Sequence, residues 1–188
     1  MRSTLQRFIV LAAIVFSTFG GAVASAQPPR GRSPQLRWGV EAGGGGAWGT
    51  PRGPAIGAFG QIGLQFDRRF ALFYQPSLLA HALGTSDDAD VFLAFGNLAM
   101  ADVTIDILQL GLGGGFDVGR FAECTNSECV SGERSLHPAI GGRIAILLPL
   151  HTYRRRLAIP FAFHVHSTFL DGDQRLTALM FTIGVERY

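Results

Sequence analysis

The sequence predicts an all-β protein, an eight-stranded antiparallel transmembrane β-barrel that follows a cleaved signal peptide. Eight segments of roughly ten residues alternate apolar side chains with small or polar ones, as strands do when one face meets lipid and the other the lumen. Glycine is abundant, with 25 residues among 188. After the first segment, no stretch of about 20 apolar residues offers a membrane helix. A closed barrel is the remaining structure that satisfies every backbone group in lipid.

The N-terminus has the features of a secretory signal. Arg2 and Arg7 precede an apolar core at 8–19, and Ala24-Ser25-Ala26 forms a cleavage site of the A-x-A type. Ala22-Val23-Ala24 is an alternative cut. The apolar core is too short to span about 30 Å of hydrocarbon as an anchor helix.

We therefore expect three parts: a signal peptide at 1–26, a short polar lead-in at 27–35 and the barrel at 36–188. Of the 16 basic and 14 acidic residues, cleavage removes Arg2 and Arg7, so the mature chain is formally neutral. Net charge gives no reason to expect a nucleic-acid partner. We expect no cofactor.

The first three strands are expected at 36–48, at 55–66 and from Phe70 to about 81. In the first, Trp38 and Val40 share the outward face and Glu41 lies on the inward face. The second alternates most cleanly. Proline removes a ladder donor, so Pro76 predicts a bulge or a local defect in the third strand.

The fourth strand, at about 91–104, is ambiguous. Phe92 and Leu98 share a face with Asp102, and either a bulge or a register switch would explain this. The fifth strand begins near Leu108 and places leucines opposite glycines and Asp117.

The last three strands return to clear alternation. Ile140–Leu148 places Arg143 inward, and the segment 157–169 opposes its apolar residues to His164 and His166. The final strand runs from Leu176 to Tyr188.

The longer connections follow the first, third, fifth and seventh strands, at 49–54, 82–90, 120–137 and 170–175. Outer-membrane barrels place long loops outside the cell and short turns in the periplasm. Both termini and the short turns are therefore expected at the periplasmic end.

The chain resembles the small eight-stranded outer-membrane barrels of the OmpA-like and OmpX-like group. The resemblance covers 36–188 and rests on architecture and on Tyr188, an aromatic C-terminal residue of the kind that marks these proteins for assembly. One departure is Glu186, which takes a place that is usually apolar; a bulge near the end would reconcile it.

This resemblance implies a protein of a Gram-negative-type outer membrane, exported by the Sec pathway and surrounded by outer-membrane lipid and lipopolysaccharide. It implies a structural or surface-interaction role without enzymatic activity. We expect 120–137 to be the surface that contacts an extracellular partner.

Inward charges are the first candidate site: Glu41, Asp102, Asp117 and Arg143. A buried charge needs a partner, so we expect a lumen network of salt bridges and hydrogen bonds. The alternative is a small gated pore, since an eight-stranded barrel is just wide enough for its side chains.

His81, His164 and His166 form a second candidate cluster, expected near the outer rim. The pair His164 and His166 lies two residues apart on one strand, but a metal site needs three or four ligands, and we expect none. A lipid-modifying acyl hydrolase or transferase would need a serine and an acid beside the histidine. Ser167 lies on the opposite face and no carboxylate is evident, so the preferred interpretation is histidines in a polar lumen, with no catalytic residue.

Cys124 and Cys129 lie close together in an expected extracellular loop. Two cysteines in an oxidising compartment predict a disulfide. A soluble, exported lipocalin-like ligand binder is a further alternative for the whole chain. That fold requires an apolar lumen, and the inward positions of Glu41 and Arg143 argue against it.

Overall fold

The structure is a computed structural model, and it describes residues 34–49, 52–67, 69–85, 88–125, 128–152, 155–170 and 174–187. The expected signal peptide and nearly all of the lead-in lie outside these residues, as does Tyr188. Strands and short connections make up the described chain. No helix within it is long and apolar enough to cross a membrane.

Nine strands are described. Their bounds are β1 Gln35–Trp48, β2 Gly53–Gln65, β3 Phe70–Thr85, β4 Asp88–Ile105, β5 Leu108–Thr125, β6 Glu128–Ser131, β7 Ser135–Thr152, β8 Arg155–Phe169 and β9 Arg175–Arg187. Eight of them match the expected strands, usually with a few more residues at each end. The ninth, β6, is a four-residue strand that the sequence did not predict.

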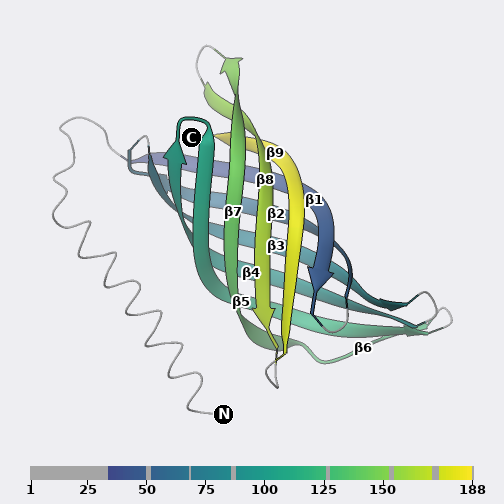
Figure 1. The fold of residues 1–188 in the computed structure, drawn as a ribbon. Coiled ribbons are helices and arrows are strands. Elements are labelled where there is room, and N and C mark those ends of the chain that lie inside the picture. Colours follow the sequence, from purple (N-terminus) through teal and green to yellow (C-terminus); the bar gives the residue numbers. More distant parts are fainter. Residues whose placement is uncertain are drawn as a thin grey trace. The chain divides into compact units, whose positions relative to one another are not determined.

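The eight long strands close into one antiparallel barrel, which confirms the predicted fold class (Figure 1). Each long strand pairs with the next long strand along the chain, so that β5 pairs with β7, and β9 pairs with β1 to close the barrel. In the closing seam Trp38 is the partner of Arg187, so the beginning of β1 and the end of β9 lie at the same end of the barrel. This is the arrangement expected of an even-stranded barrel.

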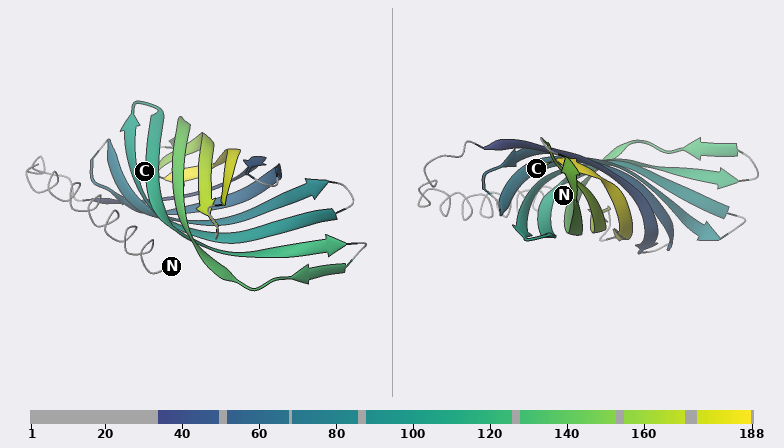
Figure 2. Two further views of the ribbon diagram at one scale, coloured as in Figure 1. Left: turned by 60° about the horizontal axis from the view of Figure 1, so that its bottom comes forward. Right: turned by 90° about the horizontal axis from the view of Figure 1, so that it is seen from above.

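At the opposite end, two hairpins continue as paired strands beyond their neighbours (Figure 2). The β3–β4 ladder runs to the pair Thr85 and Asp88, and β5 with β6 runs to Thr125 and Glu128. The predictions of loops at 82–90 and 120–137 were therefore wrong for most of those residues. Small and polar residues are frequent in these sequences, so their alternation is weak, but the backbone pairing continues.

Two predicted irregularities resolve without a shift in register. Gly60 and Gln61 lose their pairing opposite Pro76, yet the register of β2 with β3 is the same on both sides, so the proline marks a local defect and no bulge. β4 pairs without interruption on both edges, and Asp102 faces inward together with Phe92. Neither the bulge nor the register switch considered for this strand exists.

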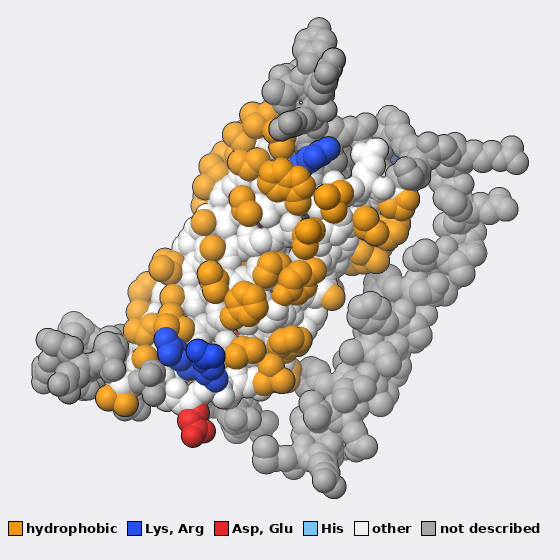
Figure 3. Space-filling view, turned by 180° about the vertical axis from the view of Figure 1, so that it is seen from behind, with side chains coloured by type: hydrophobic (Ala, Val, Ile, Leu, Met, Phe, Trp, Pro, Cys, Tyr) orange, Lys and Arg blue, Asp and Glu red, His pale blue; other side chains and the backbone are white. Residues whose placement is uncertain are grey.

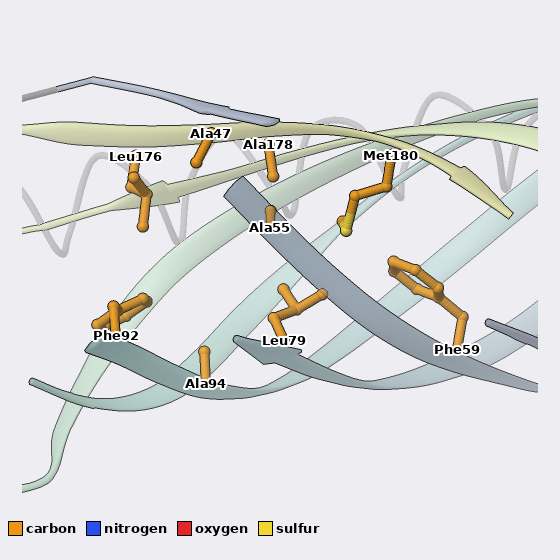
Figure 4. Close-up of a cluster of buried hydrophobic side chains, with 9 residues drawn as sticks. All are labelled: Ala47, Ala55, Phe59, Leu79, Phe92, Ala94, Leu176, Ala178 and Met180. Carbon is orange, nitrogen blue, oxygen red and sulfur yellow. The ribbon is translucent and has the colours of Figure 1, made fainter. Parts of the chain in front are cut away.

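The outer part of the lumen is filled by apolar side chains, which explains the apolar inward face of β4. Nine buried residues from five strands point into the same space (Figure 4). They are Ala47, Ala55, Phe59, Leu79, Phe92, Ala94, Leu176, Ala178 and Met180. Phe73 and Leu98 belong to a second, separate group of buried apolar residues. The barrel therefore has a solid core there.

The exterior is apolar along the length of the barrel. Large hydrophobic side chains are exposed on every long strand, including Ile56 at 65% and Leu112 at 72%. On the face shown in Figure 3, hydrophobic side chains cover the middle, and the described charged side chains lie towards the two ends. A soluble protein buries such residues, so this surface fits lipid. The lipocalin alternative is wrong, since its polarity is the reverse.

The closing seam depends on two glycines where β1 meets β9. A Cβ atom at Gly43 would lie 1.9 Å from the carbonyl oxygen of Phe181, and one at Gly45 would lie 1.9 Å from that of Leu179. Both obstacles are backbone, so no side-chain rearrangement relieves them. The adjacent Gly46 is different, because the nearest atom to its Cβ would be 3.6 Å away, on Trp48.

We predict that Gly45→Ala destabilises the barrel by about 1–3 kcal/mol, because overpacking forces the two strands apart. The measurement is the urea midpoint of the protein refolded in detergent micelles. Gly46→Ala is the matched control in the same strand and should shift the midpoint little. Equal midpoints for the two variants would contradict the seam geometry.

Candidate functional site

The candidate site is a buried ion-pair network in the half of the lumen nearest the termini, and Arg143 on β7 is its centre. Arg143 Nη2 lies 2.6 Å from Glu41 Oε1 and 3.1 Å from Glu186 Oε2. Its Nη1 lies 3.5 Å from Asp102 Oδ2 and donates to Gln109 Oε1. One guanidinium thus joins carboxylates from β1, β4 and β9 across the barrel.

Arg37 on β1 is the second cation of the network. Its Nη2 donates to Asp102 Oδ2 at 2.6 Å, and its Nε lies 2.9 Å from Glu186 Oε1. Gln109 ties both arginines together, because its Oε1 accepts from Arg37 Nη2 at 3.2 Å and from Arg143 Nη1. Its Nε2 donates to Glu186 Oε1 at 3.1 Å. The Arg37 guanidinium also stacks 4.9 Å from the centre of the Phe73 ring, a favourable cation–π contact.

Glu41 connects this network to the middle of the barrel. Besides Arg143, its carboxylate accepts from Gln61 Nε2, His164 Nε2 and Thr182 Oγ1, each at 2.8 Å. The His164 ring in turn stacks on Phe59, with ring centroids 4.1 Å apart. Phe59 belongs to the apolar cluster of the outer lumen, so the polar and apolar parts of the core are in direct contact.

The energetics of this network follow from its complete burial. The side chains of Arg37, Glu41, Asp102, Arg143 and Glu186 all have 0% exposure. Removing such charges from water is costly, and only mutual pairing with further hydrogen bonds offsets the cost. Two guanidinium groups and three carboxylates held this way form a fixed plug, because breaking any one pair leaves an uncompensated buried charge.

Asp117 lies apart from this network, although it was expected to share it. Its Oδ2 accepts from His166 Nε2 at 2.8 Å and from Thr168 Oγ1. The neighbouring position is Gly96, where a Cβ would lie 2.3 Å from Ser77 Oγ and 2.8 Å from Asp117 Oδ1. The glycine makes room for a separate polar group higher in the lumen.

The three histidines of the expected rim cluster have three different environments. His164 binds Glu41 and His166 binds Asp117, so both have the carboxylate partner that the sequence did not reveal. His81 is 1% exposed, and neither of its ring nitrogens has a hydrogen-bond partner among the described residues. The three therefore do not form a single cluster around a common centre.

Ser77, His166 and Asp117 together have the composition of a hydrolytic triad but lack its geometry. An activated serine hydrogen-bonds to its base. Ser77 Oγ has no hydrogen-bond partner within the described chain, nor does His166 Nδ1. All three side chains are at most 2% exposed, beside the apolar cluster. The described residues also contain no group of three or more side chains placed to hold a metal ion.

Sequence reasoning missed Arg37, Gln109 and Glu186 as members of the network. Arg37 lies on the inward face of the first strand, and alternation alone assigns Gln109 the same face as Asp117. Glu186 had the clearest signal, because it breaks the apolar pattern near the C-terminus. It does so without a bulge: β9 keeps one register with β1 through Arg187, and the Glu186 side chain points into the lumen.

Comparison with known structures supports the fold. The neisserial surface protein A, NspA, superposes with a TM-score of 0.57 over 83% of this chain and 99% of that protein, at 8% identity. Ail, the attachment invasion locus protein of Yersinia pestis, gives 0.53 over 82% of this chain and 99% of its own, at 12% identity. Ail in complex with the heparin analogue sucrose octasulfate gives the same TM-score at 11% identity.

These likenesses confirm the resemblance to small eight-stranded outer-membrane barrels at the level of fold. No family model matches the sequence, and no curated protein matches it significantly. The architecture is therefore shared, whereas the side chains of the lumen network have to be understood from this chain alone.

We predict that Arg143→Met destabilises the barrel by about 3–5 kcal/mol, because Glu41, Asp102 and Glu186 lose a shared buried cation. The measurement is urea unfolding in detergent micelles. Adding Glu41→Gln should recover part of the loss by removing one unpaired charge. The exposed Arg175→Gln serves as the control. Strictly additive effects of Arg143→Met and Glu41→Gln would contradict direct coupling.

Proposed function

We propose that this chain is an outer-membrane β-barrel protein with a structural or surface-interaction role and no enzymatic activity. The observation that carries the proposal is the polarity of the closed barrel. Its exterior exposes apolar side chains on every long strand, and its lumen is filled by paired charges and an apolar cluster. A protein built in this way is stable in lipid and passes little through its centre.

The filled lumen argues against the small pore. The two arginines and their carboxylate partners bridge opposite walls of the barrel, and Phe92, Met180 and Leu79 close the space beyond them. Conduction would require these pairs to separate inside a low-dielectric wall. In planar bilayers we therefore expect a plugged barrel.

A lipid-modifying enzyme is the less favoured alternative. Its candidate residues, His164 and His166, are 2% exposed and hydrogen-bond to lumen carboxylates, away from the lipid in which acyl chains lie. Lipid A acylation should be the same in cells carrying His164→Ala or His166→Ala as in cells carrying the unaltered protein.

The surface that would meet an extracellular partner is the end with the extended hairpins. There β5 and β6 form a ladder in which Cys124 is the register partner of Cys129. Directly opposed residues of antiparallel strands have Cα atoms about 4.5–5.5 Å apart, within the range that a disulfide spans. We infer that this bond forms after Sec-dependent export and stiffens the tip of the hairpin.

The first test is fractionation with heat-modifiability on a denaturing gel. We expect the protein in the outer-membrane fraction, with unboiled material migrating differently from boiled material because the closed barrel resists detergent. A soluble periplasmic protein with no shift would overturn the membrane placement.

The orientation has its own test in single-cysteine proteins that lack Cys124 and Cys129. Val130→Cys, on β6, should react with a membrane-impermeant maleimide added to intact cells. Ile107→Cys, in the β4–β5 turn at the opposite end, should react only after lysis. Both native side chains are exposed, at 71% and 51%. The reverse labelling pattern would invert the proposed topology.

A further inference from the structure

A shallow groove runs along the barrel exterior and ends at two arginines. Its volume is about 880 Å³, and it crosses β1 to β5. Its lining combines small side chains such as Ala42 and Ala58 with bulkier ones, including Ile56 and Phe95. The lining is apolar except at one end, where Arg120 and Arg134 lie.

The two arginines adjoin each other on neighbouring segments. Gly119 on β5 is the register partner of Ser135 on β7, so Arg120 and Arg134 are the next residue beyond that pair on each segment. Like charges placed opposite one another repel, which destabilises the free protein. Within the described residues, neither side chain makes an ion pair or a hydrogen bond, so no carboxylate among them is paired with either arginine.

Their height on the barrel matches a lipid headgroup. Along β5 the outward residues from Leu110 to Val118 are apolar or glycine, and Arg120 is the first outward charge beyond them. Along β7, Arg134 precedes the outward Leu136 in the same way. About ten residues of strand cross a membrane, so the arginines lie at the edge of the apolar band. This edge is at the end with the extended hairpins.

We propose that this groove binds a phosphorylated, multiply acylated glycolipid of the outer leaflet, with a phosphate between Arg120 and Arg134 and an acyl chain along the groove. Paired guanidinium groups suit a phosphate, because they donate several charge-assisted hydrogen bonds in a planar fork. The apolar lining suits a hydrocarbon chain. The anion also removes the repulsion between the arginines. The inference rests on the membrane placement proposed above.

The test is native mass spectrometry of the complete barrel in detergent micelles titrated with diphosphoryl lipid A. The double variant Arg120→Gln/Arg134→Gln should bind about tenfold more weakly or worse, since it loses charge-assisted hydrogen bonds. Lipid A without phosphates should bind the unaltered protein as weakly as diphosphoryl lipid A binds the variant. Inorganic phosphate at millimolar concentration should compete little, because it has no acyl chain to occupy the apolar part of the groove.

Two controls separate this site from general charge and from misfolding. Arg175→Gln removes an exposed arginine at the same end that does not line the groove, and it should bind lipid A as the unaltered protein does. Ala58→Phe places a large ring in the groove and should weaken binding while both arginines stay. Heat-modifiability of each variant distinguishes loss of the lipid site from loss of the barrel.

Unchanged binding in Arg120→Gln/Arg134→Gln would overturn the proposal, as would an equal loss in Arg175→Gln. A dimer of the unaltered protein that dissociates in Ala58→Phe would show that a second copy of the chain occupies the groove, and it would overturn the lipid assignment too. Failure of the heat-modifiability test in the unaltered protein would instead count against the proposed membrane placement.

Discussion

The attraction between two buried arginines and three buried carboxylates is the interaction on which the rest of this barrel depends. Arg143 reaches Glu41, Asp102 and Glu186 on three other strands, and Arg37 contacts two of the same acids. A barrel with lipid outside cannot gain stability by burying an apolar face against another layer. Its lumen must provide the specific contacts, and here these contacts connect strands that are far apart in sequence.

The apolar cluster complements this network. The outer lumen holds Phe59, Phe92 and Met180 in one apolar cluster, and Phe59 lies flat against the His164 ring that hydrogen-bonds to Glu41. The apolar side chains keep water from one end of the ion pairs, which strengthens their attraction. The exterior can then remain largely apolar, because the lumen accommodates most of the buried charges.

Much of the fold could be predicted because alternation is strong wherever the two faces of a strand differ. In β2, Ile56 and Ile62 face lipid while Gln61 faces Glu41, and the sequence pattern alone separates them. In β4 both faces are apolar, since Phe92 and Leu98 pack in the lumen while Leu93 and Phe95 face outward. Period-two patterning carries no information there, and only the ladder to β3 and β5 shows which face is which.

The site was harder to predict than the fold. Arg143 and Glu41 are 102 residues apart, and their contact depends on the curvature and stagger of the whole barrel. Sequence alternation identifies which charges face inward but not their height, so it could not separate Asp117 from the Arg143 network. The β6 strand was missed for a related reason, because its four residues form a ladder only against the far end of β5.

The continuation of β3–β4 and β5–β6 as ladders has a consequence for recognition. A flexible loop loses conformational entropy when it binds a partner, and this loss weakens every complex that it forms. Two paired strands have already lost this conformational entropy during folding. Side chains along them, such as Val130, therefore stand at regular intervals before any encounter. A small contact area on paired strands can therefore support tighter binding than the same area on a flexible loop.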